Sequence, residues 1–324
     1  MSDPEWFLKL TGFDEAGYAE TQRRLKLQGS VLYSSEGKRI GHVGQFRMVP
    51  LFNLRKRLGD LSTGQIDFGD IAGESGALHR DHDNAGSTMQ VASQFNCLEM
   101  LGPDITPEHG VTQYAYDRTQ GPVCAIAAGA GTIWRNYLIP MGQRTGQTRK
   151  HQLDGAACLG ALISGAMKYP GSAPWRMKNG YLLPSEKELR LIKDLLEGMS
   201  EEGLDKLRGE LSVGMQVGVE IDCPTQHRLT QVFCSAVPVS YSGLDPDLWE
   251  PLARLVLEAS YEATLIAAAM NARHTANPNC FLTMLGGGAF GNRTIWIEQA
   301  IERALEICGR LDLRVRLVHY AGGI

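Results

Sequence analysis

The sequence lacks several features that would assign it at once to a large class of proteins. It has no Cys-x-x-Cys pair, and its seven cysteines are an odd number, spaced for neither a disulfide framework nor a zinc site. No apolar run approaches the roughly 20 residues that cross a bilayer, and the first residues show no signal-peptide pattern. We therefore expect a cytoplasmic protein with reduced thiols and no membrane partner.

Basic charge and the common nucleotide and nucleophile motifs are also missing. The net charge is −4 over 324 residues, which argues against nucleic acid as a partner. There is neither the Gly-Lys-Ser/Thr of a Walker A loop nor a Gly-x-Ser-x-Gly nucleophile elbow. Hydrophobic residues make up 43% of the chain, so a sizeable core is expected.

Hydrophobic periodicity predicts helices that alternate with strands in the C-terminal third. A strand over 228–239 precedes a helix over 248–271, a strand over 280–285, a helix over 295–311 and an alternating strand over 313–320. This order is typical of a mainly parallel sheet covered on both faces. We predict an α/β protein with a three-layer α/β/α fold and a mixed, mainly parallel sheet.

Further strands are predicted upstream, over 65–68, 88–96 and 214–221. The continuous apolar run from Pro122 to Ala128 favours a strand buried on both faces. Residues 129–132 are then expected to form a loop at its carboxyl end.

Two segments fall outside this alternating pattern. Residues 1–60 are expected to form an N-terminal extension packed on the core. Residues 61–324 are expected to form the main domain, with a helical insertion at about 140–212. Within the insertion, Ser185 and Glu188 have the spacing of a capping box that begins a helix.

The most informative segment is the glycine loop, Gly286-Gly287-Gly288-Ala289-Phe290-Gly291-Asn292, between a predicted strand and a predicted helix. Glycines let backbone N–H groups approach an anion closely, and a helix N-terminus adds free donors and a positive dipole. In open α/β sheets, ligands bind at the carboxyl ends of strands. The loop predicts a phosphate or diphosphate site; a plain tight turn is the alternative.

This loop resembles the second ligand loop of macrodomains and of poly(ADP-ribose) glycohydrolases, and Gly69-Asp70-Ile71 is similar to the macrodomain Gly-Asp-Ile. The Asn-Ala-Ala-Asn of ordinary macrodomains and the paired glutamates of the glycohydrolases are absent. With the stretches 94–99, 116–122 and 131–137, the chain resembles the atypical macrodomain group of bacterial effector hydrolases and eukaryotic homologues. Members of that group remove ADP-ribose from arginine.

The resemblance implies a macrodomain-like pocket for ADP-ribose without a cofactor. Asp70 would accept a hydrogen bond from the adenine amino group, and the glycine loop would hold the diphosphate and distal ribose. Thr132 and Arg135 follow the predicted strand 122–128, so they are expected to reach the pocket, where Arg135 could pair with a phosphate; a surface arginine is the alternative. The expected ligand-binding residues are Asp70, Ile71, Gln94, Thr132, Arg135, Gly286, Gly287, Gly288, Ala289, Phe290, Gly291 and Asn292.

Cleavage of an ADP-ribosyl bond passes through an oxocarbenium-like state and needs a carboxylate that activates water or holds the ribose hydroxyls. Glu99, just past a predicted strand end, is the first catalytic candidate, with Asn96 facing the distal ribose; a solvated loop glutamate is the alternative. Asp117 is the second candidate, although a strand over 122–128 would place it at the opposite edge of the sheet. Glu262 is expected on a helix surface.

A further cluster, His79-Arg80-Asp81-His82-Asp83, contains residue types that bind zinc or magnesium. Adjacent residues rarely converge on one ion, so we favour a solvated acidic loop near the adenine end and expect no metal.

The expected function is to bind ADP-ribose and to hydrolyse it from a modified protein side chain, arginine by resemblance. The expected partners are therefore ADP-ribose and ADP-ribosylated proteins. Three alternatives stay open, because one pocket serves several functions. They are a reader module without turnover, a hydrolase of another ADP-ribose-type nucleotide and a non-enzymatic scaffold.

Overall fold

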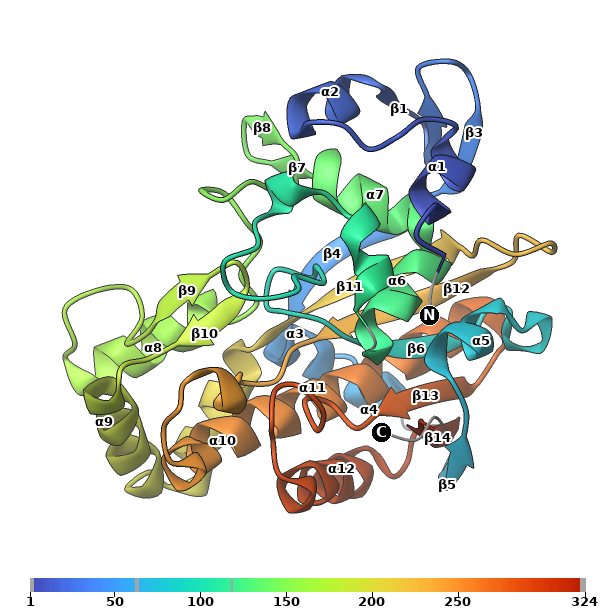
Figure 1. Cartoon of the computed structure of the whole chain (residues 1–324). Helices are drawn as coiled ribbons and strands as arrows, with labels where there is room; N and C mark the ends of the chain where they lie inside the picture. Colours follow the sequence, from blue (N-terminus) through green and yellow to red (C-terminus); the bar gives the residue numbers. More distant parts are fainter. Residues whose placement is uncertain (1–2, 62–63, 118, 321–324) are drawn as a thin grey trace.

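The centre of the molecule is a seven-stranded sheet in the order β4-β11-β12-β6-β13-β14-β5. Figure 1 shows the computed structural model, which describes residues 3–61, 64–117 and 119–320. Neighbouring strands from β12 to β5 are parallel, and β11 is antiparallel to both of its neighbours. The mixed, mainly parallel sheet is thereby confirmed. The strands are β4 (Gln45–Pro50), β5 (Ile66–Ala72), β6 (Thr88–Ala92), β11 (Ser212–Glu220), β12 (Arg228–Cys234), β13 (Asn279–Thr283) and β14 (Leu313–His319).

Helices cover both faces of this sheet, which confirms the three layers. On β12, Val232 belongs to the main core cluster with α11 (Pro246–Thr275) and α12 (Thr294–Cys308), whereas its neighbour Phe233 packs with Cys124 of α6 (Gln120–Ala127). Successive side chains of a strand point to opposite faces, so α11 and α6 lie on opposite sides. Within the described residues, no helix combines the length and apolarity needed to span a membrane.

The predicted strand over 122–128 is wrong, because this run forms α6, and α7 (Gly129–Tyr137) occupies the predicted loop. Helix α6 is buried almost all round. It therefore has no polar stripe, and its periodicity cannot be told from that of a buried strand. Pro122 lies in the first turn of α6, where no helical hydrogen bond needs its missing N–H.

The N-terminal part of the described chain builds a small sheet of its own and also contributes to the central domain. A three-stranded antiparallel sheet and helices α1 and α2 pack near α7, and β4 pairs with β11 as an edge strand of the central sheet. The predicted boundary at residue 60 stays a prediction. The small sheet and its helices are α1 (Trp6–Thr11), α2 (Tyr18–Arg23), β1 (Leu25–Gln28), β2 (Val31–Ser34) and β3 (Arg39–His42). Two short helices that follow β4, α3 (Leu51–Arg55) and α4 (Leu58–Leu61), pack on α11 in the main core.

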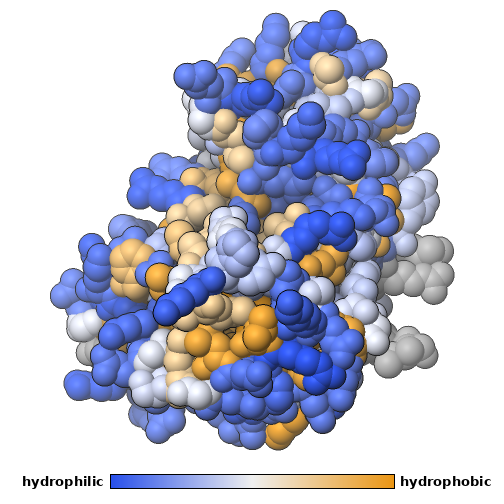
Figure 2. All heavy atoms as spheres, turned by 90° about the vertical axis from the view of Figure 1, so that its left-hand side faces the viewer, coloured by the Kyte–Doolittle hydropathy of each residue, from blue (hydrophilic) through white to orange (hydrophobic). Residues whose placement is uncertain are grey.

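The segment 140–212 lies beside the sheet, on the left of Figure 1, where α9 packs on α11 and α10 packs on α3. The capping box is confirmed: Ser185 N donates to Glu188 Oε2 (2.7 Å), and Glu188 N donates to Ser185 Oγ (3.4 Å). On this side of the molecule, apolar surface gathers at the centre and polar surface surrounds it (Figure 2). The elements are β7 (Pro140–Met141), β8 (Arg144–Thr145), α8 (Ala157–Met167), β9 (Arg176–Lys178), β10 (Tyr181–Leu183), α9 (Glu186–Glu197) and α10 (Glu201–Glu210).

The acidic side chain of Glu262 is fully buried on α11, and not on the helix surface as expected. Arg55 Nε lies 2.5 Å from Glu262 Oε1, and Arg303 Nη1 lies 3.2 Å from Glu262 Oε2. A buried carboxylate needs such partners to offset its lost hydration. These ion pairs tie α3 and α12 to α11, so Glu262 belongs to the core.

Candidate functional site

A cavity of about 410 Å³ opens at the carboxyl edge of the central sheet. The strands β6 and β13 pair only through Thr88 with Cys280 and Met89 with Phe281. Beyond these pairs, the side chain of Gln90 replaces a strand partner, since its Oε1 accepts a hydrogen bond from Thr283 N (3.1 Å). The two strands therefore separate where ligands of open α/β sheets bind.

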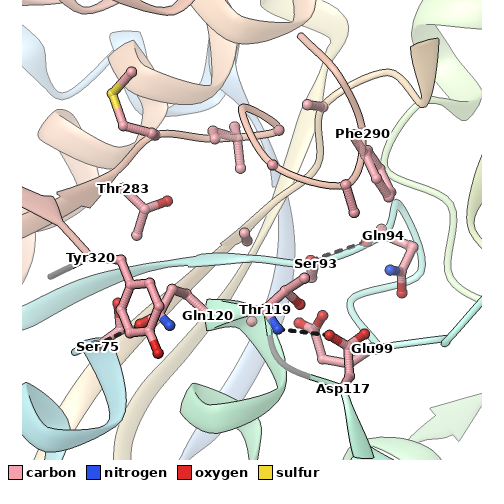
Figure 3. A pocket seen from close by; sticks show the side chains of 18 of the residues that line it. Ser75, Ser93, Gln94, Glu99, Asp117, Thr119, Gln120, Thr283, Phe290 and Tyr320 are labelled. Atoms are coloured by element: carbon pink, nitrogen blue, oxygen red, sulfur yellow. Dashed lines mark hydrogen bonds between the residues drawn. The ribbon is translucent and has the colours of Figure 1, made fainter. Parts of the chain in front are cut away.

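The glycine loop 286–292 closes one side of this cavity (Figure 3). Gly286 has φ of +73°, and a Cβ there would overlap the Cβ of Ala236. At the other end of the loop, Asn292 N donates to Gly286 O (2.9 Å), and Asn292 Nδ2 donates to Val237 O (2.8 Å). The backbone of the loop is thus fixed by its own sequence.

The loop also presents unused donors. In the part of the chain that the structure describes, no acceptor receives a hydrogen bond from the N–H groups of Gly288, Ala289 or Phe290. Consecutive free N–H groups in a turn form an anion-binding concavity. Gly286, Gly288, Ala289 and Phe290 line the cavity, whereas Gly287, Gly291 and Asn292 lie behind it and shape the turn.

Two carboxyl groups, Glu99 and Asp117, lie side by side in the cavity opposite the glycine loop (Figure 3). Glu99 is 5% exposed, and its Oε1 has no hydrogen-bond partner among the described residues. Burial, and then the neighbouring charge of Asp117, raise the pKa of Glu99 well above its ordinary value, while Arg135 opposes the shift. A proton-holding carboxyl beside a second carboxyl is the arrangement of an acid–base pair.

Asp117 reaches this edge of the sheet because the segment after it is a helix. Helix α6 starts at the carboxyl edge and runs back across the sheet, and Asp117 accepts a hydrogen bond from Thr119 N (2.7 Å) just before it. At Gly121, a Cβ would overlap Ala92 O and lie 2.5 Å from Glu99 Oε2. The expectation that Asp117 lies at the opposite edge is therefore wrong. Arg118 lies outside the described residues.

Besides the three loop residues behind the cavity, the predicted site residues Asn96, Thr132 and Arg135 do not line it. Asn96 is buried, accepting a hydrogen bond from Leu98 N (3.0 Å) and donating to Gln152 Oε1 (2.8 Å). Thr132 and Arg135 lie on α7, a helix, and not in a loop after a strand. Since that helix packs behind the site, neither side chain is among the lining residues.

At the end of the cavity where adenine was expected, Asp70 itself is not a lining residue. Asp70 Oδ1 lies 2.7 Å from His319 Nε2, and it is His319, with Tyr320, that lines the cavity. Ile71 packs against an apolar cluster that contains Val318. In Figure 3, Tyr320 and Ser75 mark this end, away from Phe290. The Gly-Asp-Ile motif therefore sits beside the cavity and contacts it through a histidine that no sequence signal marked.

The opposite end of the cavity is aromatic. The rings of Tyr181 and Tyr241 lie 5.4 and 5.6 Å from the ring of Phe290. Tyr181 comes from β10 of the segment 140–212, so this segment takes part in the site, which the sequence did not indicate. Gln94 lines the same end, and its amide is held by Met100 N (2.6 Å) and Met100 O (3.4 Å).

The His79–Asp83 cluster is used for local structure. His79 is buried, and its Nδ1 lies 2.7 Å from Ser75 O at the start of helix α5 (Ser75–Arg80). Asp81 accepts a hydrogen bond from Asp83 N (3.0 Å) to cap the 3₁₀ turn His82–Asn84. Over the described ranges, no group of three or more His, Cys, Asp or Glu side chains could hold a metal ion.

The raised pKa of Glu99 predicts a pH-dependent gain in stability for Glu99→Gln. The folded chain holds this proton above 4.5, the ordinary value, whereas the unfolded chain releases it, so wild-type stability falls as pH rises above that value. We expect Glu99→Gln to be more stable than the wild type at pH 7 and equal to it below about pH 4. Thermal unfolding from pH 4 to 8 measures the difference; a constant or inverted difference would contradict the assignment.

No protein-family model and no curated protein matches the sequence. Among solved structures, a poly(ADP-ribose) glycohydrolase from Deinococcus radiodurans in complex with ADP-ribose is similar over 86% of this chain and 89% of that chain, with 10% identity and a TM-score of 0.47. The poly(ADP-ribose) glycohydrolase from Thermomonospora curvata, bound to the inhibitor ADP-HPD, is similar over 94% of this chain and 93% of that chain, with 13% identity and a TM-score of 0.42. Likeness at this level transfers neither site residues nor activity, so function has to be inferred from the geometry of this chain.

Proposed function

We propose that the protein binds ADP-ribose in the cavity at the carboxyl edge of the sheet and hydrolyses mono-ADP-ribose from modified protein side chains. The observation that carries the proposal is one cavity with the carboxyl pair Glu99 and Asp117 on one side and the free N–H groups of 288–290 on the other. Membership of the atypical macrodomain group and a cytoplasmic location belong to the proposal; the seven free cysteines support a reducing compartment.

The size and lining of the cavity suit an extended nucleotide. Its volume of about 410 Å³ lies within the range of small-molecule sites. None of the described lining residues is lysine or arginine, so the backbone N–H groups of 288–290 are the donors for the diphosphate. The ring of Tyr320 is available to stack on adenine at one end, which leaves the distal ribose near Glu99.

The carboxyl pair can divide the chemistry of hydrolysis. The bond between the anomeric carbon and the side-chain nitrogen breaks, and a water oxygen bonds to that carbon. Asp117 takes a proton from this water, and Glu99, which holds its proton in the folded chain, gives that proton to the departing nitrogen. The products are free ADP-ribose and the unmodified side chain, and the two carboxyl groups exchange protons with solvent afterwards.

Arginine is the modified residue that we propose. Its guanidino group is cationic and planar and pairs readily with carboxylates. Asp117 provides a carboxylate at the scissile end, and no lysine or arginine is among the described lining residues, which favours a cationic side chain as the modified residue. Release of ADP-ribose from arginine-modified, serine-modified and glutamate-modified proteins, and from poly(ADP-ribose), would compare the linkages directly.

Calorimetric titration with ADP-ribose, AMP and NAD tests the binding step. We expect ADP-ribose to bind most tightly, because AMP lacks the second phosphate and distal ribose, and the nicotinamide of NAD adds bulk where Glu99 and Asp117 lie. At about 100 times its Kd, ADP-ribose should stabilise the fold by roughly 2.7 kcal/mol. No thermal shift with ADP-ribose would contradict the proposal, and binding without turnover of any modified protein would identify a reader module.

A further inference from the structure

The loop that carries Glu99, residues 94–100, is held by buried side chains that lie behind the cavity. Cys97 adopts a positive φ of 59°, which an L-residue rarely takes without support from its surroundings. Arg135 Nε donates to Cys97 O (2.6 Å), and Tyr114 accepts a hydrogen bond at its hydroxyl from Glu99 N (3.2 Å). Neither Arg135 nor Tyr114 is among the residues that line the cavity.

Arg135 is enclosed to an unusual degree for a charged side chain. It is fully buried, its Nη1 donates to Gln216 Oε1, and its guanidinium lies over the ring of Phe233 at 3.9 Å from the centroid. Its Nη2 has no partner among the described residues. Among the described residues, the polar contacts of its guanidinium are to backbone carbonyls and to the Gln216 amide, so this buried cation lacks a carboxylate in direct contact.

Glu99 is the carboxyl group on which the charge of Arg135 acts. Its Oε1 is likewise buried without a hydrogen-bond partner in the described structure, and the charge of Arg135 favours the ionised form of Glu99. The titratable and charged groups that face Glu99 are Asp117, Arg135, Tyr114, Tyr181, Cys97 and Cys124. Arg135 is the only cation in this set, so among the described residues it is the charge that offsets burial and the charge of Asp117.

We propose that Arg135 and Tyr114 are positioning residues: together they hold the Glu99 loop from behind, and Arg135 supplies the fixed positive charge that the Glu99 carboxyl faces. Neither residue contacts the ligand. The kinetic test of this inference rests on the proposed function. The positioning role takes the place of the phosphate contact that was expected for Arg135 from the sequence.

The first test is Tyr114→Phe, which removes one oxygen and keeps the ring. We expect kcat for release of ADP-ribose to fall about tenfold, while KM and the Kd of ADP-ribose change less than twofold. The matched control is Tyr137→Phe, because Tyr137 is also fully buried and donates to Glu15 Oε1 (2.6 Å) away from the cavity. An equal effect of both variants on kcat, or a loss of ADP-ribose affinity in Tyr114→Phe, would overturn the positioning role.

The second test removes the charge of Arg135 and follows the protonation of Glu99. The pH at which Glu99 titrates is obtained from the stability difference between each background and its Glu99→Gln derivative. We expect Arg135→Met to move this titration to higher pH and Arg135→Lys, which keeps a charge, to move it less. Arg208→Met is the control, since Arg208 is a buried arginine on α10 that pairs with Glu258 (2.5 Å); it should lower stability without moving the titration.

The two tests separate this inference from the proposed function. If the wild type releases no ADP-ribose from any modified protein, the hydrolase assignment fails, and the stability titration still decides the role of Arg135. An unchanged Glu99 titration in Arg135→Met would overturn the inference. So would a fall in ADP-ribose affinity of tenfold or more in Arg135→Lys with an unchanged titration, since that result would assign Arg135 to the phosphate.

Discussion

Replacing Glu99 with glutamine should lower kcat for release of ADP-ribose by about 10²–10⁴-fold, the usual range for loss of a general acid or base. Glutamine keeps the size of the side chain and cannot give up a proton. Glu99 is buried beside Asp117, and both effects raise its pKa well above the ordinary value, so this substitution removes the proposed acid and leaves the cavity intact. We therefore expect the Kd of ADP-ribose to stay within about threefold.

Single-turnover release of ADP-ribose from an arginine-modified protein measures this effect, with calorimetry for binding. Glu298→Gln on α12 is the control, because Glu298 is exposed and does not line the cavity. Asp117→Asn, measured in parallel, assigns the second carboxyl. Full activity in Glu99→Gln together with none in Asp117→Asn would reverse the catalytic assignment, and full activity in both variants would place the chemistry elsewhere.

Replacing Gly286 with alanine should destabilise the fold and abolish the phosphate site. The positive φ of 73° costs a residue with a Cβ about 1–2 kcal/mol, and overlap with the Ala236 Cβ adds ~1–3 kcal/mol of overpacking. The loop can relieve both only by moving, which displaces the N–H groups of 288–290. We expect a loss of ~2–5 kcal/mol in unfolding free energy and at least tenfold weaker binding of ADP-ribose.

Two other glycines separate the stability effect from the binding effect. Gly288 lines the cavity, and a Cβ there would meet no atom within 4 Å, so Gly288→Ala should keep its stability and bind ADP-ribose more weakly by crowding the phosphate. Gly165 of α8 also has open space and lies outside the cavity, so Gly165→Ala should raise stability by about 0.5–1 kcal/mol, as expected for a helix interior, and leave ADP-ribose binding unchanged. Chemical denaturation and calorimetry measure the three variants. Normal ADP-ribose binding by Gly286→Ala would show that the loop does not hold the diphosphate.

Much of the C-terminal half could be predicted from local patterns. The order of β12, α11, β13, α12 and β14 along the chain follows from periodicities of two and 3.6 residues, and the structure confirms it. The glycine loop 286–292 was placed correctly between β13 and α12, because a run of glycines marks a backbone with special geometry in any context.

The middle of the chain could not be predicted in the same way. Helix α6 is apolar on nearly every side, and burial on all sides erases the period that distinguishes a helix from a strand. Because a strand was predicted there, Asp117 was expected at the opposite edge of the sheet, and Thr132 and Arg135 were expected at the cavity. In the structure Asp117 lines the cavity, and Thr132 and Arg135 do not. The direction in which α6 runs along the sheet, more than residue type, decided which of these side chains lie close together.

The sequence by itself determined a mainly parallel α/β sheet, a glycine loop at a strand end, and a glutamate, Glu99, just past another strand. Each depends on chain-local chemistry: periodicity, missing Cβ atoms and the position of a residue after a strand. Only the tertiary structure decided that Asp117 faces Glu99, that Tyr181 and His319 line the same cavity and that Arg135 stands behind it. These neighbours come from elements far apart in sequence, and packing alone determines which of them share one desolvated space.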